Sequence, residues 1–225
     1  MKISKGKKLL ILGILLVVID QVIKILVKTN MCIGEQFNVL GDWFRICFVE
    51  NEGMAFGMKF GGNIGKACLS IFRIGLFGFL CWWITSLVRK GTKLSDGTYK
   101  PATTGALVGL TLIAAGALGN ILDSLFYGLV FSASTPMDVA SFGGNYAPML
   151  FGKVVDMFYF PLIDTYWPDW MPFVGGNRFV FFQPVFNFAD SCVSVGAVYL
   201  LLFQYKFFFV EDNGEKKDKK KKAIK

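Results

Sequence analysis

The chain has 225 residues, of which 54% are hydrophobic and 16% aromatic, and its mean hydropathy is +0.51. This composition excludes an ordinary soluble domain of the same length and indicates a membrane protein. The net charge of +8 does not indicate nucleic-acid binding, because seven of the 24 Lys and Arg residues lie in the tail 211–225 and most of the others flank apolar runs.

Apolar runs predict four membrane-spanning helices, at about 9–28, 67–88, 103–127 and 187–210. The first run follows a basic start, as in a signal peptide, but it exceeds the apolar core of about 7–15 residues that such peptides have, so we expect an uncleaved helix. Between the runs lie two larger segments, 29–65 and 128–186. Alternating apolar residues from Asp42 to Val49 predict strands in the first of these segments. We therefore expect a single integral membrane domain over 1–225, all-α, with four transmembrane helices, a small extracytoplasmic β-rich lobe, an interfacial helix or loop segment and a cytoplasmic basic tail.

The distribution of Lys and Arg predicts the orientation. The start of the chain has four, the loop 89–100 has four and the tail from Lys206 has eight, whereas each of the two larger segments has two. By the positive-inside rule, both termini are expected to be cytoplasmic and the larger segments to lie outside.

The absence of histidine excludes Ser-His-Asp and Cys-His catalysis and imidazole metal sites. The five cysteines have no CxxC spacing, so the sequence predicts no metal ion, and we expect no cofactor. Catalytic chemistry, where present, is then left to carboxylates.

Asp190 lies in the first turn of the last apolar run and Asp156 in the most apolar part of the segment before it. An acid at the edge of the membrane is costly and suggests a functional site. Two such acids held close together share one proton, which suits general acid–base catalysis. We therefore select Asp156 and Asp190 as a candidate pair.

Other polar residues in the apolar runs have a structural and a functional interpretation. Asp20 and Lys24 are spaced i, i+4, which favours an ion pair that tethers the first helix over a direct role in chemistry. One face of the third run carries Gly105, Gly109, Gly116, Asn120, Asp123 and Tyr127. We expect the glycines to form a packing seam, and Asn120 and Asp123 to support the site at least as much as packing.

The aromatic residues between Phe158 and Phe173 favour a position at the membrane surface. They are expected to anchor the segment there, with a cover over bound substrate as the alternative. Asp138, Asp164 and Asp169 stand in turn-like surroundings and are expected to be solvated.

Five short stretches carry a resemblance to bacterial lipoprotein signal peptidases, the signal peptidase II family. They are Asp20 with Lys24, NEGMAFG at 51–57, GALGNILD at 116–123, VVDMF at 154–158 and FNFAD at 186–190. The resemblance implies that Asp156 and Asp190 form a catalytic aspartate dyad. It also implies that Asn51, Gly57, Asn120, Asp123, Asn187, Asp20 and Lys24 order the site or contact substrate.

The resemblance further implies an aspartic endopeptidase that cleaves a diacylglyceryl-modified prolipoprotein N-terminal to its lipidated cysteine. The expected partners are that substrate and membrane lipid, with no nucleic acid, and the expected state is a monomer in the bacterial inner membrane with its active site at the outer face. Two features depart from the family: Ser124 follows Asp123 where the family has Arg, and 131–151 forms an extra loop.

Two other classes of function are compatible with intramembrane acids: a small proton- or ion-coupled transporter and a non-enzymatic assembly factor. No internal repeat is visible in the sequence, and the acids gather at one predicted surface. Both features favour the peptidase.

Overall fold

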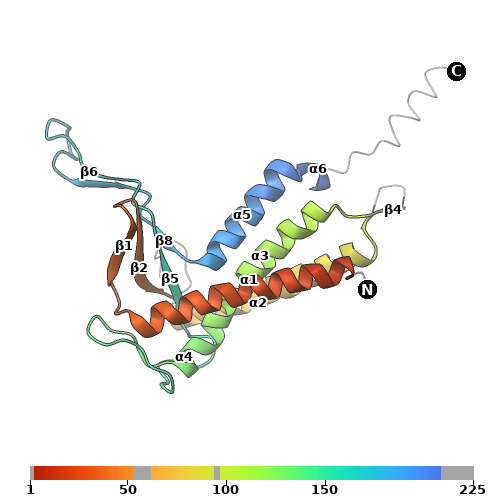
Figure 1. Cartoon of the computed structure of the whole chain (residues 1–225), viewed down its shortest axis with the longest axis horizontal. Coiled ribbons are helices and arrows are strands. Elements are labelled where there is room, and N and C mark those ends of the chain that lie inside the picture. The colour runs from red at the N-terminus through yellow and green to blue at the C-terminus, as the bar shows by residue number, and fades with distance from the viewer. Residues whose placement is uncertain (1–2, 53–61, 94–96, 209–225) are drawn as a thin grey trace.

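The computed structural model describes residues 3–52, 62–93 and 97–208. Within these ranges the longer helices are α1 (Lys5–Asn30), α2 (Gly62–Arg89), α3 (Thr104–Leu122) and α5 (Phe188–Phe203). α3 packs against each of the other three helices and so forms the centre of the bundle. The four-stranded sheet lies at one end of the bundle, which we call the sheet end, whereas α1 begins at the opposite end (Figure 1).

Among the described residues, three helical segments are long and apolar enough to cross a bilayer: α1, the part 64–89 of α2, and the continuous helix 104–130 that starts with α3. The third segment continues from α3 through the π-helical turn η2 (Asp123–Tyr127) into α4 (Gly128–Val130). α5 has 16 residues, which span about 24 Å. It is therefore shorter than a hydrocarbon core of about 30 Å. Gln204 separates α5 from the short α6 (Tyr205–Phe208). The expectation of a polytopic membrane protein holds, but the structure does not confirm four full spans.

A four-stranded antiparallel sheet joins the two segments that were expected outside the membrane. Its order is β1 (Gln36–Leu40), β2 (Phe44–Asn51), β5 (Val154–Tyr159) and β8 (Val185–Phe186). β5 therefore lies between a strand of the first segment and the strand that leads into α5. The strands expected before residue 52 are confirmed.

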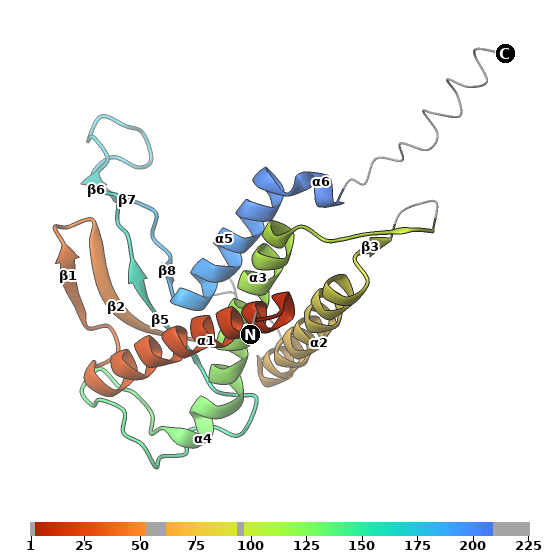
Figure 2. The ribbon, with the colours of Figure 1, turned by 45° about the vertical axis from the view of Figure 1, so that its right-hand side comes forward.

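The segment 128–186 differs from the expected helix or loop, because it supplies strands. Besides β5 and β8 it forms the hairpin of β6 (Ile163–Tyr166) and β7 (Arg178–Phe181), which extends beyond the four-stranded sheet (Figure 2). The first four residues of β5, from Val154 to Met157, are all buried, so both faces of this strand are covered. With strands in both segments, and the short pair β3 (Thr92–Lys93) and β4 (Tyr99–Lys100), the all-α class is too narrow.

Glycines let α3 and α5 approach each other closely. A Cβ atom on Gly116 would lie 2.3 Å from the carbonyl oxygen of Ala189, and one on Gly109 would lie 2.6 Å from the side chain of Leu200. Small residues at a helix interface allow such an approach inside a membrane. The expected packing seam is confirmed for these positions, and it fixes the first turn of α5 against α3.

The extra loop wraps around the sheet end of α1 and then returns to α3. The buried ammonium of Lys28 forms an ion pair with Glu50 and donates a 2.9 Å hydrogen bond to Ser134 of the loop. At the end of the loop, Gly152 donates from its backbone N–H to the carbonyl oxygen of Ser124, at 2.9 Å. A Cβ atom on Gly152 would lie 2.1 Å from the carbonyl oxygen of Asp123, so this contact requires glycine.

The helix α2 holds the same part of the loop from the other side. Lys66 donates a hydrogen bond to the carbonyl oxygen of Phe151 at 2.8 Å, and Ser70 donates one to that of Leu150 at 3.2 Å. Three segments distant in sequence thus position the start of β5, and with it Asp156.

Candidate active site

Asp156 lies on the central strand β5, opposite Val49 of β2, and is 3% exposed. Its Oδ1 atom accepts a 2.7 Å hydrogen bond from the side-chain amide of Asn187, and its Oδ2 atom accepts one of 3.3 Å from that of Asn51. Burial, followed by the nearby charge of Asp190, raises the pKa of Asp156 to about 7, against the lowering effect of these two amides. The site therefore favours a protonated Asp156 below neutral pH.

Asp190 occupies the first turn of α5, where a reciprocal cap fixes it. The side chain of Asn187 accepts a 2.9 Å hydrogen bond from the backbone N–H of Asp190, and the Asp190 carboxylate accepts one of 3.4 Å from the N–H of Asn187. Asparagine is a preferred N-cap residue, and an acid three residues later completes a capping box. This local motif starts the helix at Phe188 and turns the Asp190 side chain back towards the backbone of Asn187.

The side chain of Asn187 connects the two carboxylates. Its oxygen caps Asp190, and its amide donates both to Asp156 and, at 3.1 Å, to the Oδ1 atom of Asn120. Asn120 in turn donates a 2.7 Å hydrogen bond to Asp190. The structure thus brings together Asp156, Asp190, Asn51, Asn120 and Asn187, which the sequence had selected from four separate stretches.

Beneath this group lies a buried cluster of charges. Lys24 lies 3.0 Å from Asp20 and 2.8 Å from Asp123, and it donates a 2.8 Å hydrogen bond to Asn120. The predicted ion pair of Asp20 and Lys24 is confirmed. Since Lys24 contacts Asn120, and Asn120 contacts Asp190, the cluster acts on the carboxylates through one intervening side chain.

Each acid of the cluster also holds the backbone next to one candidate catalytic residue. Asp20 accepts a 2.8 Å hydrogen bond from the N–H of Ala189, and Asp123 accepts one of 3.3 Å from the N–H of Val155. Ala189 precedes Asp190 and Val155 precedes Asp156. The pair of buried acids therefore sets the positions of both carboxylates.

Two residues near the site were missed by the sequence argument. Gln21 donates hydrogen bonds to Asp20, Asp123 and the carbonyl oxygen of Gly119, at 2.9 to 3.2 Å. Arg73 of α2 lies within electrostatic reach of Asp190 and Asp156. A signal was available for Arg73, because it is the single charged residue in the apolar run 67–88.

The departures from the family pattern have local explanations. Asp123 is held by Lys24 and Gln21, without the guanidinium that the family places at position 124. Ser124 is buried, and its hydroxyl group donates a 3.1 Å hydrogen bond to the carbonyl oxygen of Asn120 in the same helix. The carbonyl oxygen of Ser124 accepts a hydrogen bond from the backbone N–H of Gly152.

The remaining predicted residues lie outside the site or outside the described chain. Asp138, Asp164 and Asp169 are exposed, as expected, but Asp164 lies in the strand β6 instead of a turn and forms an ion pair with Arg178. Gly57 lies outside the described residues. In the part of the chain that the structure describes, no group of three or more Cys, Asp or Glu side chains could hold a metal ion.

Fold and site together define a polytopic membrane protein with two carboxylates, joined by one asparagine, at the sheet end of its helices. The family model described as signal peptidase (SPase) II matches residues 12–206. The chain belongs to this family.

Similar proteins agree with this assignment. A lipoprotein signal peptidase of Porphyromonas gingivalis is 49% identical over 203 residues, which cover 89% of this chain and 84% of that protein. One of Amoebophilus asiaticus is 36% identical, covering 85% of this chain and 75% of the relative. A solved bacterial membrane enzyme, 22% identical, matches with a TM-score of 0.54 over 92% of this chain and 93% of its own, and so supports the fold.

Proposed function

We propose that the chain removes the signal peptide from lipid-modified prolipoproteins, with Asp156 and Asp190 as its catalytic residues. Membership in the signal peptidase II family supports the type of reaction. The observation that carries the assignment of residues is the Asn187 side chain, which bonds to both aspartates and so holds a buried pair of acids in one place.

In the proposed reaction the two carboxylates have opposite roles. Asp156, whose pKa is about 7, enters protonated and donates its proton to the scissile carbonyl oxygen. Asp190 accepts a proton from the attacking water, whose oxygen forms the new bond to carbon. The tetrahedral intermediate then collapses: Asp156 regains a proton from a hydroxyl group, Asp190 protonates the leaving nitrogen, and the C–N bond breaks.

The position of the site suits a substrate with lipid chains. Asp190 begins an apolar helix and Asp156 lies on a sheet at the end of the bundle, so acyl chains would remain in hydrocarbon while the peptide bond reaches water. We place both termini in the cytoplasm and this site at the outer face of the bacterial inner membrane, on the distribution of Lys and Arg. We propose a monomer, because one chain is sufficient to supply both carboxylates and the asparagines that bond to them.

The arrangement favours a peptidase over an ion-coupled transporter. A transporter binds its ions near the middle of the membrane, between structural repeats. Here Asp156 lies on β5 and Asp190 in the first turn of α5, so both proposed catalytic carboxylates lie beside the sheet at the end of α5.

The function can be tested with purified protein in lipid vesicles and a synthetic precursor that carries diacylglycerol on its cysteine. We expect mass spectrometry to show one cut, on the N-terminal side of the modified cysteine, and no cut in the same peptide without lipid. Equal cleavage of both peptides would contradict the proposed substrate, and no cleavage of either would contradict the function.

A further inference from the structure

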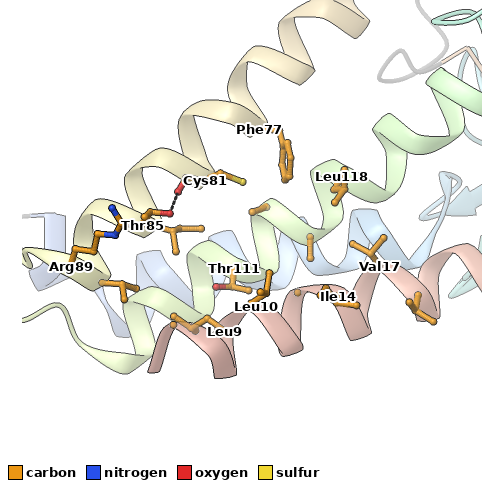
Figure 3. A pocket seen from close by; sticks show the side chains of 17 residues that line it. Leu9, Leu10, Ile14, Val17, Phe77, Cys81, Thr85, Arg89, Thr111 and Leu118 are labelled. Carbon is orange, nitrogen blue, oxygen red and sulfur yellow. Dashed lines mark hydrogen bonds between the residues drawn. The ribbon is translucent and has the colours of Figure 1, made fainter. Parts of the chain in front are cut away.

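A groove of about 490 Å³ runs along the bundle between α1, α2 and the face of α3 that lies away from α5 (Figure 3). Its volume lies within the range of about 300–1,000 Å³ that small-molecule sites have. The walls come from Leu10, Ile14, Val17, Val18, Phe77 and Leu118, among others. Leu10, Ile14 and Val18 are 64%, 55% and 51% exposed, so the described part of the chain leaves this lining uncovered.

The two threonine hydroxyl groups on the walls have no proton left to donate to a polar ligand. Thr111 donates its hydroxyl to the carbonyl oxygen of Leu107 at 2.7 Å, and Thr85 donates its hydroxyl to that of Cys81 at 2.7 Å (Figure 3). Both hydroxyl protons are thus used within their own helices. Inside a membrane, such walls suit a hydrocarbon chain.

One end of the groove carries a cation. Arg89 lines the groove in the last turn of α2, next to Gly6 at the start of α1, and its side chain is exposed. Exposed Lys7, Lys8 and Lys90 flank this end. An arginine binds phosphate through a planar pair of donors, and clustered basic residues at a membrane surface attract anionic lipid.

We propose that the groove binds one acyl chain of an anionic phospholipid, whose phosphate is held by Arg89. The lipid comes from the leaflet on the side of the N-terminus. Charge complementarity at Arg89 and the apolar length of the groove argue for this occupant.

The groove is separate from the candidate active site. Thr111, Ala114 and Leu118 line it, whereas Gly109 and Gly116 of the same helix contact α5. Since α3 stands between the groove and Asp190, an apolar substrate segment in the groove would not reach the carboxylates. The lipid would fill the space between α1 and α2 without taking part in the reaction.

The proposal can be tested by photocrosslinking in vesicles of phosphatidylcholine with a minor fraction of phosphatidylglycerol that carries a diazirine in one acyl chain. We expect peptide mapping to place the labels on Val17, Phe77 and Leu118. Unlabelled phosphatidylglycerol should compete, and unlabelled phosphatidylcholine should not.

Two matched pairs of variants sharpen the test. Gly13 lines the groove, and a Cβ atom there would make an ordinary 3.6 Å contact with Thr111, so the side chain of Gly13→Phe should fill the groove. Gly75→Phe, on the open face of α2, is the control. Arg89→Gln should weaken labelling about tenfold, as the loss of a charge-assisted hydrogen bond implies. Lys90→Gln removes a charge that flanks the groove without lining it, so it should weaken labelling less. Retained cleavage of the lipidated precursor by all four variants would show that they fold.

Labelling that is equal in Gly13→Phe and Gly75→Phe would overturn the groove as the binding site. Equal competition by phosphatidylcholine, or no effect of Arg89→Gln, would overturn the role of the phosphate. Crosslinks from a precursor's signal segment to Val17 or Leu118 would assign the groove to the substrate instead.

Discussion

The Lys24 ammonium lies 2.8 Å from the carboxylate of Asp123, and neither side chain is exposed to solvent. Asp20 also lies 3.0 Å from Lys24, so one buried cation forms ion pairs with two buried acids. Each acid accepts a hydrogen bond from the backbone beside a candidate catalytic aspartate. The cluster therefore connects the stability of the fold to the geometry of the site.

Lys24→Met is expected to destabilise the protein and to abolish cleavage. It would leave Asp20 and Asp123 buried without their cation, and breaking a buried pair from one side costs about 3–5 kcal/mol. Thermal unfolding in detergent should show the loss. Lys7→Met, on the exposed start of α1, is the control and should behave as wild type.

The contributions of Asn187 to capping α5 and to catalysis should be separable. Asn187→Ala removes the cap of α5, at a cost of about 1 kcal/mol, and also the hydrogen bond to Asp156. Asn187→Ser retains a capping hydroxyl but is too short to reach Asp156. We expect serine to restore the melting temperature but not the turnover rate. Full activity of the serine variant would show that the link to Asp156 is dispensable.

Stability should depend on pH through Asp156. Its pKa is raised from 3.8 to about 7 in the folded protein, so the unfolded chain loses the proton first as the pH rises. The free energy of unfolding should therefore fall as the pH rises from about 4 to 7, and it should level off above this window. Each unit of pKa shift corresponds to about 1.4 kcal/mol. Asp156→Asn should lack this contribution. A melting temperature with the same pH dependence in both proteins would refute the shift.

The glycine contact between α3 and α5 should be needed for activity. In Gly116→Ala the new methyl group would meet the Ala189 carbonyl oxygen at 2.3 Å, so α5 must move and Asp190 with it. Overpacking of this kind costs about 1–3 kcal/mol. Gly78→Ala, with no neighbour within 4 Å, is the matched control. We expect cleavage to fall in the first variant and to remain in the second.

The parts of the site that rest on local rules could be predicted from the sequence. The spacing of Asp20 and Lys24 implied their ion pair, and the apolar context singled out Asp156 and Asp190. The resemblance to the family supplied the remaining amides. These features depend on neighbours along one helix or on short motifs.

The rest depends on contacts between distant segments. Gln21 has no distinctive spacing, and its role appears once α1 and α3 lie together. The extra loop is positioned by Lys28, Lys66 and Ser70 of two helices, which no local pattern reveals. The surface segment was expected as helix or loop because aromatic content indicates an interface and not a backbone conformation, whereas pairing with β2 makes β5 a strand.

The most direct test of the account is the cleavage rate of Asp156→Asn and Asp190→Asn on the lipidated precursor in vesicles. Each variant is nearly isosteric and should insert and fold. Because each removes one partner of the proposed acid–base pair, the rate should fall by about 100- to 10,000-fold in both. Asp164→Asn, an exposed acid of the β6–β7 hairpin, should retain wild-type activity. Wild-type activity in either Asp156→Asn or Asp190→Asn would contradict the dyad.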